Sequence, residues 1–214
     1  MVESASFWDK VADKYSARPV ADQDAYQEKL KVTQQFFNPN MDVLEFGCGT
    51  GSTALIHAPF VASYTAIDIS QRMIEIAIGK RAQQQCEQVD LSNLHFRVAT
   101  LDDYEGTEST YDAILGLSIL HLLPNYRQAI CQAYNMLKPG GIFVTNTGCL
   151  KDHLAFMRFV IPVMQFFGIA PHVEFFSRAQ LDKAMQSAGF DIEYAWVPPK
   201  SKSSYFMICR KPGE

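Results

Sequence analysis

The chain has 214 residues, of which 48% are hydrophobic and 20% are charged, and its formal net charge at pH 7 is -4. This size and composition predict a globular protein with a core of its own and exclude a disordered or collagen-like chain. The negative charge gives no overall attraction to phosphate backbones, so we expect no nucleic acid as a partner.

The cysteines and the polarity of the chain indicate its compartment. The five cysteines are odd in number and form no Cys-X-X-Cys pair, which is typical of reduced thiols rather than of disulfides or a zinc site. The first ten residues are polar and acidic, where a secretory signal would be basic and then apolar. The most apolar stretch, 154–170, contains Arg158 and Pro162 and is shorter than the ~20 residues of a membrane span. We expect a cytoplasmic protein with no transmembrane segment and no bound metal.

The first forty residues, 1–40, contain no strand-like run. Within them, Tyr26, Leu30, Gln34 and Phe37 fall along one possible helix face. Because an apolar helix face packs against another element, we expect this segment to be a helical arm that covers the sheet.

The next segment, 41–148, alternates short apolar runs with helix-like segments. The strand-like runs are 41–46, 64–69, 94–98, 111–117 and 142–145, and the helix-like segments are 50–57, 70–85 and 125–137. Before the last of these strands, Pro139, Gly140 and Gly141 predict a helix stop and a turn. Because strands that alternate with helices pair in parallel and are covered on both faces, this order predicts a doubly wound, Rossmann-like α/β fold.

An insertion, 149–176, follows the fifth predicted strand. Its residues 154–170 are apolar on every side of a helix, a pattern typical of a buried helix. Three interpretations remain open for it. It is a helix of the core, a lid over an apolar or aromatic substrate, or a contact with a second copy or a membrane surface.

The C-terminal segment, 177–214, predicts a helix over 178–188, capped by Ser177, and two strands over 190–196 and 205–209. The link between these strands is short, which favours an antiparallel pair at the sheet edge. The expected fold is therefore a single α/β domain, with a mostly parallel seven-stranded sheet and an antiparallel C-terminal edge.

A glycine-rich loop follows the first predicted strand. Gly47, Gly49 and Gly51 stand at every second position and lead into a helix, so the backbone can turn tightly and approach a ligand closely. In an open α/β sheet the ligand lies just past the carboxyl ends of the strands, so we expect one over 47–51. Ser52 stands where a GxGxxG dinucleotide fingerprint needs its third glycine, which weakens a nicotinamide or flavin interpretation.

The stretch EFGCGTG, with Glu45 as its acidic residue, resembles motif I of the class I S-adenosylmethionine-dependent methyltransferases. The resemblance covers roughly 7–211 in order. YDAILGLSILHLL resembles motif IV, and LKPGGIFV resembles the turn before strand five. The opening FWDKVADKY resembles the FDxxAxxY entry of the subfamily that includes quinone and small-molecule methyltransferases.

The resemblance implies S-adenosyl-L-methionine as the cofactor. Asp68, at the end of the second strand, would take both ribose hydroxyls, a role that suits a carboxylate. The adenine pocket maps onto 99–101, but family members often carry Asp where Thr100 stands, and Asp102 is a possible substitute. The implied cofactor-binding residues are Glu45, Gly47, Cys48, Gly49, Gly51, Asp68, Ile69, Thr100, Leu101 and Ser118.

Several of these residues have more than one interpretation. Glu45 holds either the loop's amides or the cofactor's ammonium group, and Cys48 is most simply a small residue in a tight turn. His121 is either the general base for an oxygen or nitrogen acceptor or a packed histidine with a backbone partner. Tyr15 lies near the methionine end of the cofactor in the subfamily and is a second catalytic candidate.

The function implied by the resemblance is methyl transfer to a small, apolar or aromatic acceptor. The chain would consist of an arm (1–40), a cofactor-binding core (41–148), a lid (149–176) and a C-terminal helix and hairpin (177–214), and act as a monomer or homodimer. Two alternatives remain, a nucleotide-dependent oxidoreductase and a non-catalytic protein that binds S-adenosylmethionine.

Overall fold

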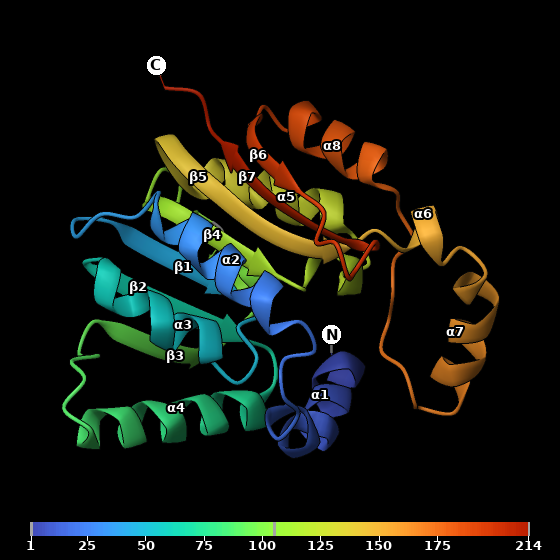
Figure 1. The fold of residues 1–214 in the computed structure, drawn as a ribbon, viewed down its shortest axis with the longest axis horizontal. Coiled ribbons are helices and arrows are strands. Elements are labelled where there is room, and N and C mark those ends of the chain that lie inside the picture. Colours follow the sequence, from blue (N-terminus) through green and yellow to red (C-terminus); the bar gives the residue numbers. More distant parts are fainter. Residues whose placement is uncertain (1, 105, 214) are drawn as a thin grey trace. The chain divides into compact units, whose positions relative to one another are not determined.

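The computed structural model describes residues 2–104 and 106–213 of the chain (Figure 1). Its contacts divide the chain into two units, Met1–Tyr104 and Glu105–Glu214. Each unit is described by itself.

The first unit has parallel strands covered by helices. Its elements are α1 (Val2–Ser16), α2 (Gln23–Gln34), β1 (Asp42–Phe46), α3 (Ser52–His57), η1 (Ala58–Phe60), β2 (Ser63–Asp68), α4 (Gln71–Cys86), β3 (Leu94–Val98) and η2 (Leu101–Tyr104). Strand β2 pairs in parallel with both β1 and β3. Leu44, Tyr64 and Ala66 have no exposed surface, so these strands form the core of the unit.

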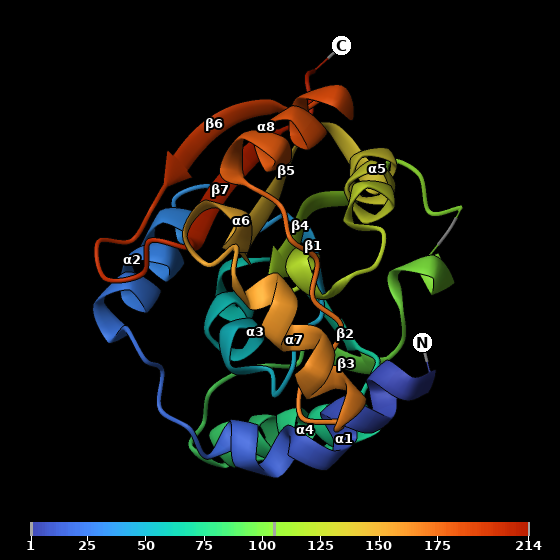
Figure 2. The same ribbon diagram turned by 90° about the vertical axis from the view of Figure 1, so that its right-hand side faces the viewer.

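The predicted N-terminal arm is helical, and its two helices pack on different neighbours. Helix α1 runs beside α4 (Figure 1, Figure 2), and α2 packs against α3. The hydroxyl groups of Tyr26 on α2 and Thr53 on α3 lie 3.2 Å apart, and Leu30 is buried. The face that the sequence pattern indicated on α2 therefore points towards α3.

The second unit adds one parallel pair of strands and an antiparallel edge. Its elements are β4 (Tyr111–Leu117), η3 (Leu120–Leu122), α5 (Tyr126–Met136), β5 (Leu137–Gly148), α6 (Leu150–His153), α7 (Met157–Phe166), α8 (Arg178–Ser187), β6 (Asp191–Trp196) and β7 (Ser204–Arg210). Strand β5 pairs in parallel with β4 and antiparallel with β7, which also pairs antiparallel with β6.

The strands follow the order β3-β2-β1-β4-β5-β7-β6 in a seven-stranded sheet. The prediction of a doubly wound, mostly parallel sheet with an antiparallel C-terminal edge is confirmed. The cap at Ser177 is confirmed as well. Its hydroxyl accepts the amide of Gln180, whose side chain accepts the amide of Ser177 in return, as in a capping box.

The predicted turn before the fifth strand is wrong. Strand β5 begins at Leu137, directly after α5, and contains Pro139 to Gly141. Its pairing with β4 steps from Leu137 to Ile142, while β4 advances only from Tyr111 to Ala113. The Pro-Gly-Gly run is thus a bulge within a long strand, because glycine tolerates the positive φ of 77° found at Gly140.

Of the three interpretations of the apolar insertion, a helix buried in the core is wrong, and the lid and the surface contact remain predictions. Helix α7 packs through Ile161, which is 8% exposed, whereas Phe159 and Phe166 on its other side are 67% and 86% exposed. Figure 1 shows α6 and α7 extending beyond the strands of the second unit. Only one side of α7 is therefore buried. Among the described residues, no helix is both long and apolar enough to cross a membrane.

Candidate cofactor site

The loop after β1 has a backbone that requires glycine. Gly47, Gly49 and Gly51 all have positive φ angles, of 67°, 55° and 72°, which side chains rarely allow. A Cβ atom at Gly51 would also lie 2.7 Å from the ring of Phe96 and 2.8 Å from Ala77. The turn that leads into α3 therefore requires glycine at the positions that the sequence pattern indicated.

Asp68 at the end of β2 holds this loop in place. One carboxylate oxygen accepts the amide of Gly49 at 2.9 Å, and the other accepts the amide of Ser70 at 2.9 Å. Burial raises the pKa of the Asp68 carboxyl, and the two hydrogen bonds oppose that rise. The amide of Ile69 contributes a further hydrogen bond to this carboxyl, and a carboxylate has lone pairs beyond those that the amides use. The residue therefore fits a ribose while it also anchors the loop.

Glu45 lies in the core just before the loop. It is 2% exposed, and the hydroxyl of Tyr64 donates to its carboxyl at 2.8 Å. Burial raises the pKa of Glu45 to about 8, and the charge of Asp68 adds to the rise. At neutral pH the carboxyl is therefore mostly protonated. Of the two interpretations of Glu45, the hydrogen bond to the loop's amides is not favoured, because the amide of Gly49 donates to Asp68 instead.

Cys48 occupies the loop as a small buried side chain. Its thiol donates to the carbonyl oxygen of Gly49 at 3.7 Å, and its amide donates to the carbonyl of Ile67 at 3.0 Å. Burial raises the pKa of the thiol well above its usual value, with Glu45 and Asp68 adding to the effect. A thiol that stays protonated is a weak nucleophile, which favours the structural interpretation.

Tyr15, near the end of α1, covers the loop. A Cβ atom added at Gly49 would lie 3.8 Å from Cε1 of the Tyr15 ring. Partial burial raises the pKa of the Tyr15 phenol, and the nearby carboxyls of Asp68 and Glu45 raise it further. The phenol therefore remains a neutral donor over the glycine loop. The structure brings it together with the predicted residues of the loop and of β2.

The end of β3 lies beside Asp68, as the parallel pairing requires. Asp68 pairs with Val98, and Ile69 and Leu101 follow these strand ends. The amide and hydroxyl of Thr100 both donate to one oxygen of Asp103, at 2.7 and 2.8 Å. These bonds start η2 and hold the pKa of Asp103 below its usual range. Asp103 was missed in the sequence, although Thr-X-X-Asp is a capping-box pattern that points to it.

Ser118 and His121 follow β4 in the second unit. Ser118 has a positive φ of 59°, and its amide donates to the carbonyl of Asn146 at 2.6 Å. The Nδ1 atom of His121 lies 3.0 Å from the hydroxyl of Thr147 and accepts the amide of Gly148 at 3.4 Å. Burial lowers the pKa of His121 to about 4. The imidazole is therefore neutral at pH 7, with its proton on Nε2.

The predicted residues thus fall into two groups. The loop, Asp68 and its strand neighbours, and Tyr15 come together in the first unit, whereas Ser118 and His121 belong to the second. Among the residues that the structure describes, no three His, Cys, Asp or Glu side chains gather as a metal site requires.

Known proteins share this chain's sequence pattern and fold. Residues 21–195 match the family model described as a methyltransferase domain. A demethylmenaquinone methyltransferase of Tropheryma whipplei is 31% identical over 145 residues, which are 68% of this chain and 55% of that protein. A malonyl-[acyl-carrier protein] O-methyltransferase of Priestia megaterium is 27% identical over 77% of this chain and 59% of its own length. The chain therefore spans a little over half the length of these two relatives.

Solved structures agree with the fold. A Haloferax volcanii methyltransferase in complex with the Trm112 activator superposes with a TM-score of 0.73 at 15% identity, over 99% of this chain and 98% of that one. At that identity the likeness speaks for the architecture alone. The family model of a methyltransferase domain covers most of the chain. The chain belongs to the class I S-adenosylmethionine-dependent methyltransferases.

Proposed function

We propose that this protein transfers the methyl group of S-adenosyl-L-methionine to a small apolar or aromatic acceptor. The observation that carries the proposal is the Asp68 carboxylate. It fixes the glycine loop through Gly49, and a carboxylate has acceptor capacity beyond the amides of Gly49 and Ser70. A buried carboxylate with this capacity suits a ligand that presents two neighbouring hydroxyl groups.

The other residues of the site would each contact a different part of the cofactor. Asp68 would accept the ribose hydroxyls, and Thr100 and Leu101 would border the adenine. Glu45 would lie on the side of the ammonium group, and Tyr15 near the methyl group. Ile69, Cys48 and the three glycines would contribute backbone and close packing. Ser118, which follows β4 in the second unit, is proposed as a cofactor residue on the family resemblance alone.

When bound, the cofactor supplies an electrophilic methyl group on a positively charged sulfur. The positive charge disappears in the transition state, so the protein's main contribution is alignment and a site with little water. The neutral phenol of Tyr15 and the protonated Glu45 suit such a site because neither adds a charge at neutral pH. The chain's residues would bind and orient, with little proton transfer.

His121 would serve as a hydrogen-bond donor rather than as a strong base. Gly148 donates to its Nδ1, so the neutral ring carries its proton on Nε2. With a pKa of about 4, the imidazole takes up a proton poorly at pH 7. We infer that Nε2 orients an acceptor oxygen, and that the acceptor arrives with little need for deprotonation.

The acceptor is proposed to be apolar because of the insertion 149–176. On α7 and beside it, Phe156, Phe159, Phe166 and Phe167 are all more than half exposed. Aromatic side chains without a covering element suit an apolar molecule, which supports the interpretation as a lid. The two relatives named above act, by their names, on demethylmenaquinone and on a malonyl group, so they do not indicate a common acceptor.

We also propose a cytoplasmic location and a monomer or homodimer. All five cysteines are free thiols, which suits a reducing compartment. Light scattering after gel filtration measures the mass of the assembly, and a trimer or larger species would contradict the second part.

Calorimetric titration with S-adenosyl-L-methionine tests the proposed function. Wild type should bind it, and Asp68→Ala should weaken binding by about 1–3 kcal/mol, because two charge-assisted hydrogen bonds to the ribose are lost. Asp90→Ala is the matched control, since Asp90 is an exposed carboxylate that accepts the amide of Ser92 away from the loop. Circular dichroism of each variant checks that the fold remains.

Three results would contradict the proposal. One is unchanged affinity in Asp68→Ala. Another is binding of NADH but not of S-adenosylmethionine, which would favour an oxidoreductase. The third is cofactor affinity without any S-adenosylhomocysteine formed across a panel of phenols, quinols, amines and fatty acids, which would favour a non-catalytic binding protein.

A further inference from the structure

Helix α1 is attached to the first unit by a small apolar surface and by several polar contacts. Of its side chains described by the structure, residues 4–16, Ala12 alone is buried. A helix of 15 residues with so little apolar burial opens more easily than the core beneath it. Its attachment therefore depends on the few strong contacts that it makes.

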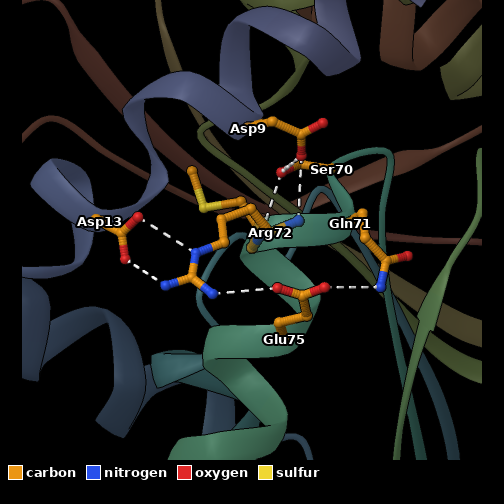
Figure 3. Close-up of polar contacts among 7 residues, drawn as sticks. Asp9, Asp13, Ser70, Gln71, Arg72 and Glu75 are labelled. Carbon is orange, nitrogen blue, oxygen red and sulfur yellow. Dashed lines mark hydrogen bonds and ion pairs between the residues drawn. The ribbon is translucent and has the colours of Figure 1, made fainter.

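Two carboxylates one turn apart on α1 make these contacts with the start of α4, as Figure 3 shows. One oxygen of Asp9 accepts the hydroxyl of Ser70 at 2.6 Å and the amide of Arg72 at 3.1 Å. Asp13 accepts Nη2 of Arg72 at 2.7 Å and Nε at 3.2 Å, a two-point contact with the guanidinium plane. We call these four residues, Asp9, Asp13, Ser70 and Arg72, the α1 latch.

The latch is continuous with the cofactor loop. The amide of Ser70 donates to Asp68 at 2.9 Å, while its hydroxyl donates to Asp9. The other oxygen of Asp68 accepts the amide of Gly49, and Tyr15 of α1 lies over that same glycine. Helix α1 therefore touches the loop twice, through Ser70 and Asp68 near its middle and through Tyr15 near its end.

We propose that Asp9, Asp13 and Arg72 are positioning residues that hold α1 closed over the cofactor loop and thereby set how long the cofactor stays bound. The proposal rests on the proposed function, because it assumes S-adenosylmethionine in this site. A cofactor beneath Tyr15 leaves only when α1 moves. Each contact that ties α1 to α4 then slows dissociation without touching the cofactor.

The chain offers a matched pair of variants on a single guanidinium. Arg72 also donates to Glu75 at 3.1 Å through Nη1. Glu75 belongs to α4, so that contact stays within one helix, whereas Asp13 connects two helices. Asp13→Asn removes the ion pair between the helices, and Glu75→Gln removes another exposed carboxylate from the same arginine while leaving that ion pair in place.

Dissociation of radiolabelled S-adenosylmethionine after a chase with unlabelled cofactor measures the effect. Asp13→Asn should dissociate about two- to fivefold faster than wild type at low salt, the range expected for an exposed ion pair. Glu75→Gln should dissociate at the wild-type rate. At 1 M salt, where the screening length is about 3 Å, wild type and Asp13→Asn should converge.

Trp8 supplies a second measurement that needs no cofactor. It lies on α1 with its ring edge-on to Tyr15, and the chain's other tryptophan is Trp196. In a Trp196→Phe background, quenching by acrylamide reports the movement of α1 alone. Asp13→Asn should be quenched more than Glu75→Gln, and melting temperatures should show whether either variant affects the whole fold.

Two outcomes would overturn the proposal that the α1 latch sets the dissociation rate. One is equal dissociation rates for wild type and Asp13→Asn, and the other is equal acceleration by Asp13→Asn and Glu75→Gln. If wild type fails to bind S-adenosylmethionine at all, the proposed function fails instead. The quenching comparison then still decides the latch, because equal quenching in the two variants would refute it.

Discussion

A single residue, Asp68, holds the glycine loop in place through its hydrogen bonds. Its position after the second strand could be predicted, because the acidic end of that strand is part of the family pattern. Its hydrogen bonds to Gly49 and Ser70 could not be predicted, because they depend on how the loop turns back over β2. The hydrogen bond between Ser70 and Asp9 could not be predicted either, because 61 positions of sequence separate the two residues.

The glycines of the loop differ in what they require. Gly51→Ala should destabilise the fold by about 2–4 kcal/mol, since its Cβ would collide with Phe96 and Ala77 in addition to the left-handed backbone. Gly49→Ala has the same kind of backbone but its nearest neighbour lies 3.8 Å away, so it should cost about 1 kcal/mol. Urea unfolding compares them, and equal losses would contradict the steric argument.

His121→Gln distinguishes an orienting donor from a general base. Glutamine keeps an N–H donor, so kcat should fall by less than about tenfold if Nε2 only orients the acceptor. Loss of a true general base would lower kcat by about 10²–10⁴-fold. Turnover is measured as S-adenosylhomocysteine released, with the affinity for the cofactor unchanged as the control.

At the scale of elements, the sequence predicted some bounds to the residue and misplaced others. Strands β3 and β4 have the predicted bounds, and α4 (Gln71–Cys86) lies within one residue of the predicted 70–85 at each end. Strand β5 was misjudged, because Pro-Gly-Gly is typical of a turn and only the paired strand reveals a bulge. For helix α7 the sequence left a core helix, a lid and a surface contact open, because apolar composition records what a helix could bury and not whether a neighbour is present.

The two sides of α7 should respond differently to mutation. Phe166→Ser should change the free energy of unfolding by less than about 0.5 kcal/mol, because the side chain is 86% exposed. Ile161→Ala should cost about 2–3 kcal/mol, because the Ile161 side chain is buried. Urea denaturation of both variants tests this, and a large loss for Phe166→Ser would mean that its ring is covered in solution.

At the scale of the whole molecule, buried ionisable groups set how stability depends on pH. Burial lowers the pKa of His57 and His121 to about 4, so the unfolded chain binds more protons as pH falls below 6.5. Glu45 has the opposite sign. Its raised pKa means that the folded chain holds a proton that the unfolded chain loses between pH 4.5 and 8.

Stability should therefore be greatest near pH 6.5. Below that pH both histidines favour unfolding, and above it Glu45 reduces stability by about 2 kcal/mol by pH 8. Urea denaturation between pH 4.5 and 8 measures the curve. Glu45→Gln should remove the alkaline decline while the acid side remains, and a variant that keeps the decline would assign it to another group.

The anchoring of the glycine loop limits how its motif could be moved to another protein. The stretch EFGCGTG alone lacks Asp68, whose carboxylate accepts the amide of Gly49, and Ser70, whose amide donates to Asp68. The segment to transfer is the whole strand-helix-strand-helix stretch from Asp42 to Cys86, because it includes Gly49, Asp68 and Ser70. A graft of the seven-residue motif into a foreign sheet should form a turn but no ribose site.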